Sequence, residues 1–171
     1  INDKVANLCK FFAVSNLRNM LNPDFLVNFR ASSSCNSEKN IINSRAWIQT
    51  AINVSKNIET LPYNAKKLKG YLPELRGMTV KKPEDFLPRM REIFAECGIA
   101  FVLLPHLKNS GVNGAVKWMS QDRVMLAMNN RGIYADKFWF SLFHEIKHVL
   151  QQKIKTIFVS STVEEMIDIN N

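Results

Sequence analysis

Two kinds of hydrophobic spacing divide the chain into a helical part and a part that contains strands. Up to residue 97, apolar side chains recur every three or four positions, as on the buried face of amphipathic helices. This spacing predicts helices over residues 2–21 (one or two short ones), 41–58, 64–76 and 83–97. After residue 97, short apolar runs predict strands over residues 99–104, 114–120, 123–128 and 156–159. The strands over residues 114–120 and 123–128 are expected to form a hairpin. The expected fold class is α+β, with a mostly helical N-terminal half followed by a small sheet of three to four strands.

Helix-breaking and turn-forming residues mark the boundaries of these elements. Pro83 in the first turn and Gly98 just past the end delimit the helix predicted over residues 83–97. Pro73 lies inside another predicted helix and is expected to kink or divide it, because proline has no N–H to donate. The serine-rich polar stretch 30–40 predicts a flexible loop, and the internal boundary of the chain is expected there.

Residues 137–152 predict a further helix with two different faces. Its broad apolar face is made of Phe138, Trp139, Leu142, Phe143, Ile146, Val149 and Leu150. On the other side, a polar stripe roughly 100° wide holds Ser141, His144, Glu145, His148 and Gln152. Asp136 precedes this helix and is expected to cap it, which is a structural role and not a catalytic one.

The polar stripe contains a pattern that is typical of a metal site. His144 and His148 are four residues apart, so both imidazoles leave one helix face and can bind the same ion. Glu145 can reach a water on that ion without ligating it, and would act as a general base in hydrolysis. The alternative is a chance pair of surface histidines. Two of the chain's three histidines stand at ligand spacing beside this glutamate, which favours metal binding.

A zinc site of this kind needs a third protein ligand, and several candidates stay open. Glu164 and Glu165 follow on a helix predicted to begin near Thr162, but they serve equally well as first-turn residues of a capping box. A carboxylate beyond Asn171 is another candidate. His106, which follows a predicted strand, is either a ligand, a substrate contact or an ordinary loop histidine.

Composition narrows the class of protein. Hydrophobic residues make up 46% of the 171 positions and charged residues 22%, which excludes a disordered tail. No apolar run approaches the roughly 20 residues of a membrane-spanning helix, so we expect no membrane partner. The cysteine usage, odd in number and without a Cys-x-x-Cys pair, leads us to expect a reducing, cytoplasmic environment. Three widely spaced cysteines argue against both a disulfide framework and a cysteine zinc site: Cys9, Cys35 and Cys97. The net charge of +8 is spread along the chain and is weak support for DNA binding.

Four segments, in this order and spacing, resemble the ImmA/IrrE metallopeptidase domain found in HigA-like antitoxin and XRE-family regulator proteins. They are Leu72-Pro-Glu-Leu-Arg76, Gly98-Ile-Ala-Phe-Val-Leu-Leu-Pro105, Val112-Asn-Gly-Ala-Val-Lys-Trp118 and Asp136-Lys-Phe-Trp-Phe-Ser-Leu-Phe-His-Glu-Ile-Lys-His148. The resemblance covers roughly residues 72–159. Two upstream segments show a weaker similarity: Phe11-Phe-Ala-Val-Ser15 and Phe29-Arg-Ala31.

This resemblance implies a small gluzincin-like α+β domain that is zinc-dependent, cytoplasmic, and of bacterial or phage origin. Members of the family cleave a repressor or act in toxin–antitoxin operons, often with a helix-turn-helix domain ahead of the peptidase. We therefore expect residues 1–35 to be a helical remnant or linker of a lost helix-turn-helix domain. Residues 36–171 would be the peptidase domain, incomplete at its C-terminus, and DNA would be contacted only through the missing N-terminal domain.

By the same resemblance, His144 and His148 match the zinc ligands and Glu145 matches the general base. The chain departs from the family at two points. The third ligand usually lies further along than this chain extends, and Lys147 stands where the family has a small residue. The implied function is a zinc-dependent endopeptidase of narrow specificity that cleaves a repressor or a toxin. The alternative is a non-catalytic antitoxin-like regulator that binds a toxin or a signal.

Overall fold

The computed structural model describes residues 2–18, 38–131, 136–151 and 157–160. The helices in these ranges are α1 (Asn2–Phe12), α3 (Glu38–Ser55), α4 (Ala65–Gly77), the short 3-10 helix η2 (Met78–Val80), α5 (Pro83–Glu96) and α6 (Asp136–Leu150). The strands are β1 (Ile99–Leu104), β2 (Gly114–Ser120), β3 (Arg123–Asn129) and β4 (Ile157–Ser160). The α+β class and the small sheet predicted from the hydrophobic pattern are confirmed.

The four strands form one mixed sheet in the order β1-β3-β2-β4. β2 and β3 pair antiparallel as the predicted hairpin, from Gly114↔Met128 at the open end to Ser120↔Arg123 beside the turn. β1 pairs parallel with the other side of β3, and β4 pairs antiparallel with β2. Both strands of the hairpin are therefore interior strands of the sheet.

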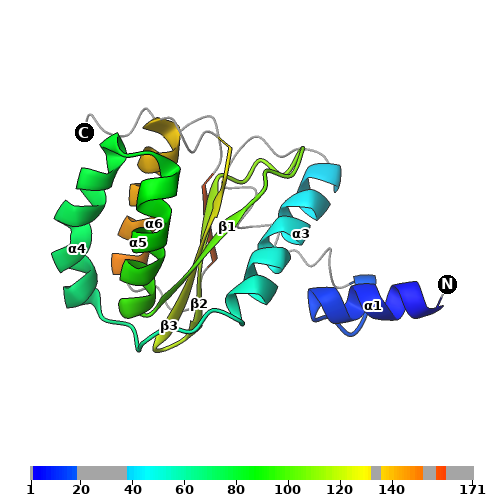
Figure 1. The fold of residues 1–171 in the computed structure, drawn as a ribbon. Helices are drawn as coiled ribbons and strands as arrows, with labels where there is room; N and C mark the ends of the chain where they lie inside the picture. Colours follow the sequence, from blue (N-terminus) through cyan, green and yellow to red (C-terminus); the bar gives the residue numbers. More distant parts are fainter. Residues whose placement is uncertain (1, 19–37, 132–135, 152–156, 161–171) are drawn as a thin grey trace.

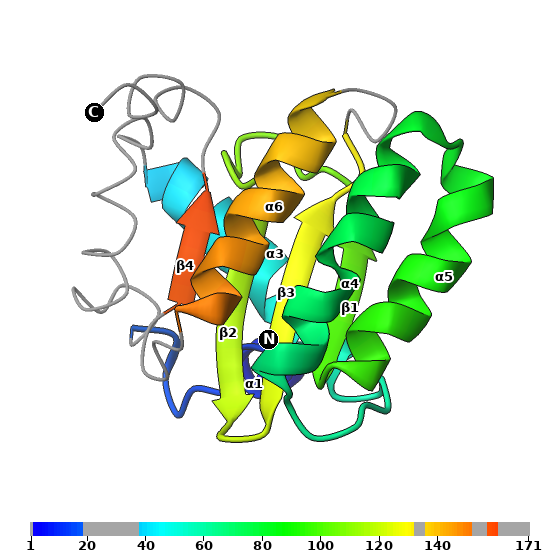
Figure 2. The ribbon, with the colours of Figure 1, turned by 90° about the vertical axis from the view of Figure 1, so that its left-hand side faces the viewer.

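Helices cover both faces of the sheet (Figures 1 and 2). On one face, α3 packs its buried Trp47, Ile48 and Ala51 against the sheet, with Ala115 and Ala127 opposite them. On the other face lie α4, α5 and α6 over the larger hydrophobic cluster. Because both faces are covered, every residue from the second position of β3 onward is buried.

The segment between α3 and α4 ties several elements together at one end of the sheet. The amide of Tyr63 donates to the carbonyl of Asp122 in the hairpin turn at 2.8 Å. Its ring meets Trp118 edge to face at a centroid distance of 4.8 Å, and its hydroxyl donates to the carbonyl of Val149 on α6 at 3.3 Å. A single residue thus links the hairpin to the last turn of α6, and no sequence pattern indicated it.

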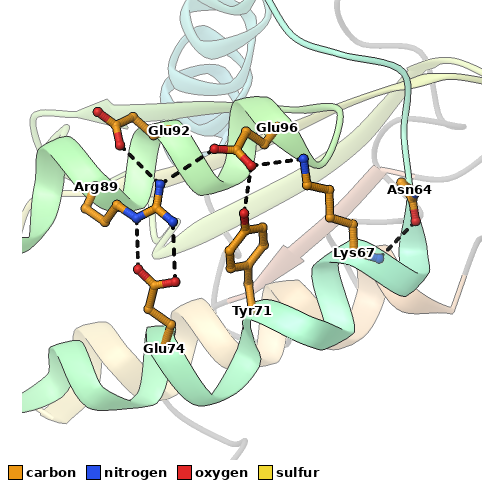
Figure 3. A network of polar contacts seen from close by, with 7 residues as sticks. All are labelled: Asn64, Lys67, Tyr71, Glu74, Arg89, Glu92 and Glu96. Atoms are coloured by element: carbon orange, nitrogen blue, oxygen red, sulfur yellow. Dashed lines mark hydrogen bonds and ion pairs between the residues drawn. The ribbon is translucent and has the colours of Figure 1, made fainter.

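A polar network joins α4 to α5 on their outer side (Figure 3). The guanidinium of Arg89 donates through Nε to Glu74 at 2.8 Å, while Glu96 accepts from the Tyr71 hydroxyl at 2.7 Å and pairs with Lys67 at 2.9 Å. These bonds, first that of Tyr71 and then that of Lys67, hold the pKa of the Glu96 carboxyl below its usual value. Because all of these groups face solvent, the network fixes the helix pairing more than it raises stability.

The structure revises two helix predictions. Pro73 does not divide α4, which continues through it as one helix. Pro73 and Lys69 are both exposed, so the carbonyl that loses its partner faces water, which can solvate it. The helix predicted over residues 41–58 instead begins at Glu38, inside the polar stretch that was expected to be a loop, and ends at Ser55.

Arg123 binds the carbonyl groups at the end of α3. Its guanidinium donates to the carbonyl of Ser55 at 2.7 Å and also to the carbonyl of Ile58. The carbonyl of Ser55 accepts from the amide of Ile58 as well, at 3.2 Å, so this helix end is satisfied by both a turn and a side chain. The arginine at the start of β3 therefore caps a helix that lies far away in the sequence.

Several predictions fall outside the described residues, and the fold does not test them. They are the second short helix up to residue 21, the loop over residues 30–37, the domain boundary between residues 35 and 36, and the helix expected near Thr162. Among the helices in the described ranges, none is both long enough and apolar enough to cross a membrane.

We expect Gly98→Ala to lower the free energy of unfolding by about 2–4 kcal/mol. Gly98 has φ +81°, and a Cβ there would lie 2.3 Å from the Cα of Tyr63, which belongs to the backbone and cannot move aside. Urea unfolding of Gly98→Ala beside Gly77→Ala measures the difference, since a Cβ at Gly77 meets nothing within 4 Å. Equal stability of the two variants would contradict this account.

Candidate metal site on helix α6

The apolar face of α6 fixes this helix on the sheet as the sequence predicted. Leu142 and Val149 are fully buried, and Phe138 and Ile146 are 2% exposed. These side chains recur at helical spacing and enter the larger core. α6 lies over β2, β4 and β3, so its remaining residues run along the boundary between sheet and solvent (Figure 2).

His144 and His148 lie together on α6, as their spacing predicts. Their Nε2 atoms are 2.7 Å apart, the ring centroids are 4.4 Å apart, and the rings stand at 82° to each other. Both side chains are half-buried. The two Nε2 atoms are thus within hydrogen-bond distance of each other, and the tautomers of the rings decide which one donates.

This geometry is compatible with a shared metal ion. Two nitrogen ligands at about 2.0–2.1 Å from a tetrahedral zinc ion are about 3.3 Å apart. The Nε2 atoms of His144 and His148, now 2.7 Å apart, would have to separate by about 0.6 Å. The two donors are thus already close to the arrangement that a metal requires.

Glu145 lies on the side of α6 that faces the sheet. It is fully buried, although the sequence places it in the polar stripe, and Ser141 in the same stripe is only 8% exposed. Its Cγ and Oε1 atoms approach Gly114 on β2, close to the Sδ atom of Met128 on β3. The polar stripe is therefore partly covered by the sheet, with the carboxylate on the inner side and the imidazoles on the outer side.

Asn129 holds the backbone that leads into Gly114. Its side-chain Nδ2 donates to the carbonyl of Val112 at 2.6 Å, and its own amide donates to the carbonyl of Asn113 at 2.9 Å. Asn129 is 4% exposed, so water does not compete for these bonds. No sequence pattern singled out Asn129 or Gly114 as site residues. A glycine in a strand often marks a close approach, and that signal could have identified Gly114.

The other candidates do not join this cluster within the described residues. His106 is exposed, and its Nε2 accepts a hydrogen bond from the guanidinium of Arg131 at 3.4 Å. Asp136 is the first residue of α6, where its charge favours the helix N-terminus. Lys147 is exposed, off the polar stripe, as expected. Glu164 and Glu165, the candidate third ligands, lie outside the described residues. In the ranges that are described, no group of three or more His, Cys, Asp or Glu side chains could hold a metal ion.

No protein-family model, curated protein or solved structure matches this chain. The resemblance to the ImmA/IrrE domain therefore depends on the sequence segments alone. The chemistry of the site has to be argued from the side chains of α6 and of the strands beneath it.

We expect Asn129→Ala to lower the free energy of unfolding by about 1–3 kcal/mol, because it leaves the buried carbonyl of Val112 without its donor. Asn130→Ala is the matched control. Asn130 is exposed, and the bond from its amide to the carbonyl of Leu104 survives the substitution. Chemical denaturation of both variants measures the difference. A loss for Asn130→Ala as large as that for Asn129→Ala would show that the buried side-chain bond is unimportant.

Proposed function

We propose that this chain is a zinc-dependent endopeptidase of narrow protein specificity. In this proposal His144 and His148 bind the zinc ion and Glu145 is the general base. The observation that carries the proposal is the convergence of the two Nε2 atoms at 2.7 Å, with a buried carboxylate on the same turn of a helix fixed on the sheet.

The protein's contribution to such a reaction is positioning. α6 is held by its buried apolar face and by the bond from Tyr63 to the carbonyl of Val149, one residue past His148. A zinc ion, when bound, would polarise the scissile carbonyl and lower the pKa of a bound water. A carboxylate oxygen of Glu145 takes the proton of the attacking water and passes it to the leaving nitrogen. Within the described residues, the side chains of His144 and His148 keep part of their surface exposed.

The substrate proposed here is a protein, either a transcriptional repressor or a toxin, in the cytoplasm. The proposal needs a carboxylate as third ligand, from Glu164, Glu165 or a residue beyond Asn171. DNA binding would belong to an N-terminal helix-turn-helix domain and not to residues 36–171. The basis for these points is the resemblance of the sequence segments.

One observation favours a second candidate, a non-catalytic regulator that binds a toxin or a signal with the same fold. The Nε2 atoms of His144 and His148 lie within hydrogen-bond distance of each other, so the two rings can be joined directly as a structural pair. A protein that only binds a partner would keep this pair and the packing of α6. The two candidates therefore differ in zinc content and not in fold.

Metal analysis of the purified protein separates the two candidates. The peptidase is expected to retain about one zinc ion per chain after dialysis, and His144→Ala is expected to weaken zinc binding by more than about 100-fold. His106→Ala is the control, since His106 lies outside the cluster on α6. A folded wild-type protein that binds no added zinc would favour the regulator.

Replacement of the base tests the catalytic assignment separately. Glu145→Gln keeps the size of the side chain, so zinc content is expected to stay unchanged. Cleavage is expected to fall by a factor on the order of 10²–10⁴. Mass spectrometry of a peptide library incubated with the zinc-loaded protein measures cleavage, because such a library samples many candidate sequences at once. Unchanged proteolysis by Glu145→Gln would remove Glu145 from the mechanism.

A further inference from the structure

Gly114 is a glycine because of space and not because of its backbone conformation. Its φ lies outside the left-handed region, unlike that of Gly98, so an alanine could adopt the same backbone. A Cβ at Gly114 would nevertheless lie 2.8 Å from Cγ of Glu145, 2.9 Å from Sδ of Met128 and 3.0 Å from Oε1 of Glu145. Two of these three atoms belong to the glutamate on α6, and the shortest of the distances is to it.

The strand beneath Glu145 is held from several sides. Gly114 pairs with Met128 on β3 and with Ser160 on β4, so it belongs to an interior strand. The two residues before it are bound by Asn129 through the carbonyls of Val112 and Asn113. Backbone that is paired on both sides cannot withdraw from the helix. An added methyl group therefore has to displace something above it.

The structure assigns Gly114 as the positioning residue for the Glu145 carboxylate, an inference that rests on the proposed function for its catalytic meaning. The bare Cα of Gly114 lets the carboxylate settle against β2, at a fixed depth below the turn that carries the imidazoles. A methyl group would force Glu145 to rotate away or α6 to rise from the sheet. Either response changes the position of the carboxylate relative to His144 and His148.

Met128 is the flexible member of this contact. Its thioether can change rotamer at low cost, so an added methyl at Gly114 can push the Sδ atom aside. The Cγ atom of Glu145 lies nearer to its own helix backbone and has less freedom. The main cost of filling this space is therefore expected to come from Glu145.

A double-mutant cycle between positions 114 and 145 tests the assignment without any activity assay. We expect Gly114→Ala to lower Tm by about 3–8 °C when Glu145 is present. The same substitution made together with Glu145→Ala is expected to cost at most about a third of that shift, since only Met128 remains to be displaced. Gly70→Ala is the control, because a Cβ there meets nothing within 4 Å, and its Tm is expected to stay equal or rise.

The outcomes separate clearly. A Tm loss for Gly114→Ala that Glu145→Ala relieves supports the assignment, and so does recovery of folding if Gly114→Ala alone does not fold. Equal losses with and without Glu145 would overturn it, because the added methyl would then disturb only the strand. If the wild-type protein binds no zinc but the coupling is present, the positioning stands and the proposed function fails. If the wild-type protein cleaves peptides but Gly114→Ala lowers Tm equally with and without Glu145, the proposed function stands and the positioning role of Gly114 fails.

Steady-state kinetics distinguish a positioning role of Gly114 from a purely structural one, because only the positioning role predicts a change in kcat. For the zinc-loaded protein, we expect Gly114→Ala to keep the zinc content and KM while kcat falls by at least about tenfold, because the general base is displaced from its working position. If KM rises while kcat stays unchanged, so that kcat/KM falls only because of KM, the positioning role is contradicted. Gly70→Ala is expected to leave both constants unchanged.

Discussion

The packing of α6 on the sheet is the interaction on which the rest of this structure depends. The helix buries Leu142, Ile146 and Val149 against the strands, which sets its height and its rotation about its own axis. With that rotation fixed, the imidazoles of His144 and His148 lie at the rim and Glu145 lies underneath. A rotation of α6 by one residue position, roughly 100°, would carry both imidazoles into the buried positions of Glu145 and Val149. The opposite rotation would move Glu145 to the half-buried position of His144.

The same packing places an acidic residue inside the protein. A carboxyl group that leaves water is costly unless other groups compensate for the loss of hydration. Glu145 is fully buried, with buried Ser141 one turn before it and buried Val149 one turn after it. Sequences that only needed a stable helix–sheet interface would have an apolar residue there. The presence of the acid is thus more informative about function than the histidines, which a protein surface accepts easily.

Much of the architecture could be predicted from the sequence, because it follows from local periodicity. The spacing of apolar residues located α5, α6 and the three strands from 99 to 129 within a residue or two, and the four-residue spacing brought the two imidazoles together. What could not be predicted depends on partners far away in the chain. Arg123 binds the carbonyls of Ser55 and Ile58 from 68 and 65 positions away, and Tyr63 reaches α6 from 86 positions away. The burial of Glu145 depends on which strand lies below it, and periodicity carries no information on that.

The β2–β3 hairpin has one closed end and one open end, and the site lies over the open one. The turn joins Ser120 to Arg123, whereas Gly114 and Met128 are the last pair before the chains diverge. The open end of a hairpin is where strand pairs fray first, and amide hydrogen exchange is fastest in such regions. Asn129 crosses this opening and fastens β3 to the residues ahead of β2. The Asn129 side chain therefore opposes fraying at this end. If β2 and β3 separated there for a moment, the carboxylate of Glu145 would lose the strand that it packs against.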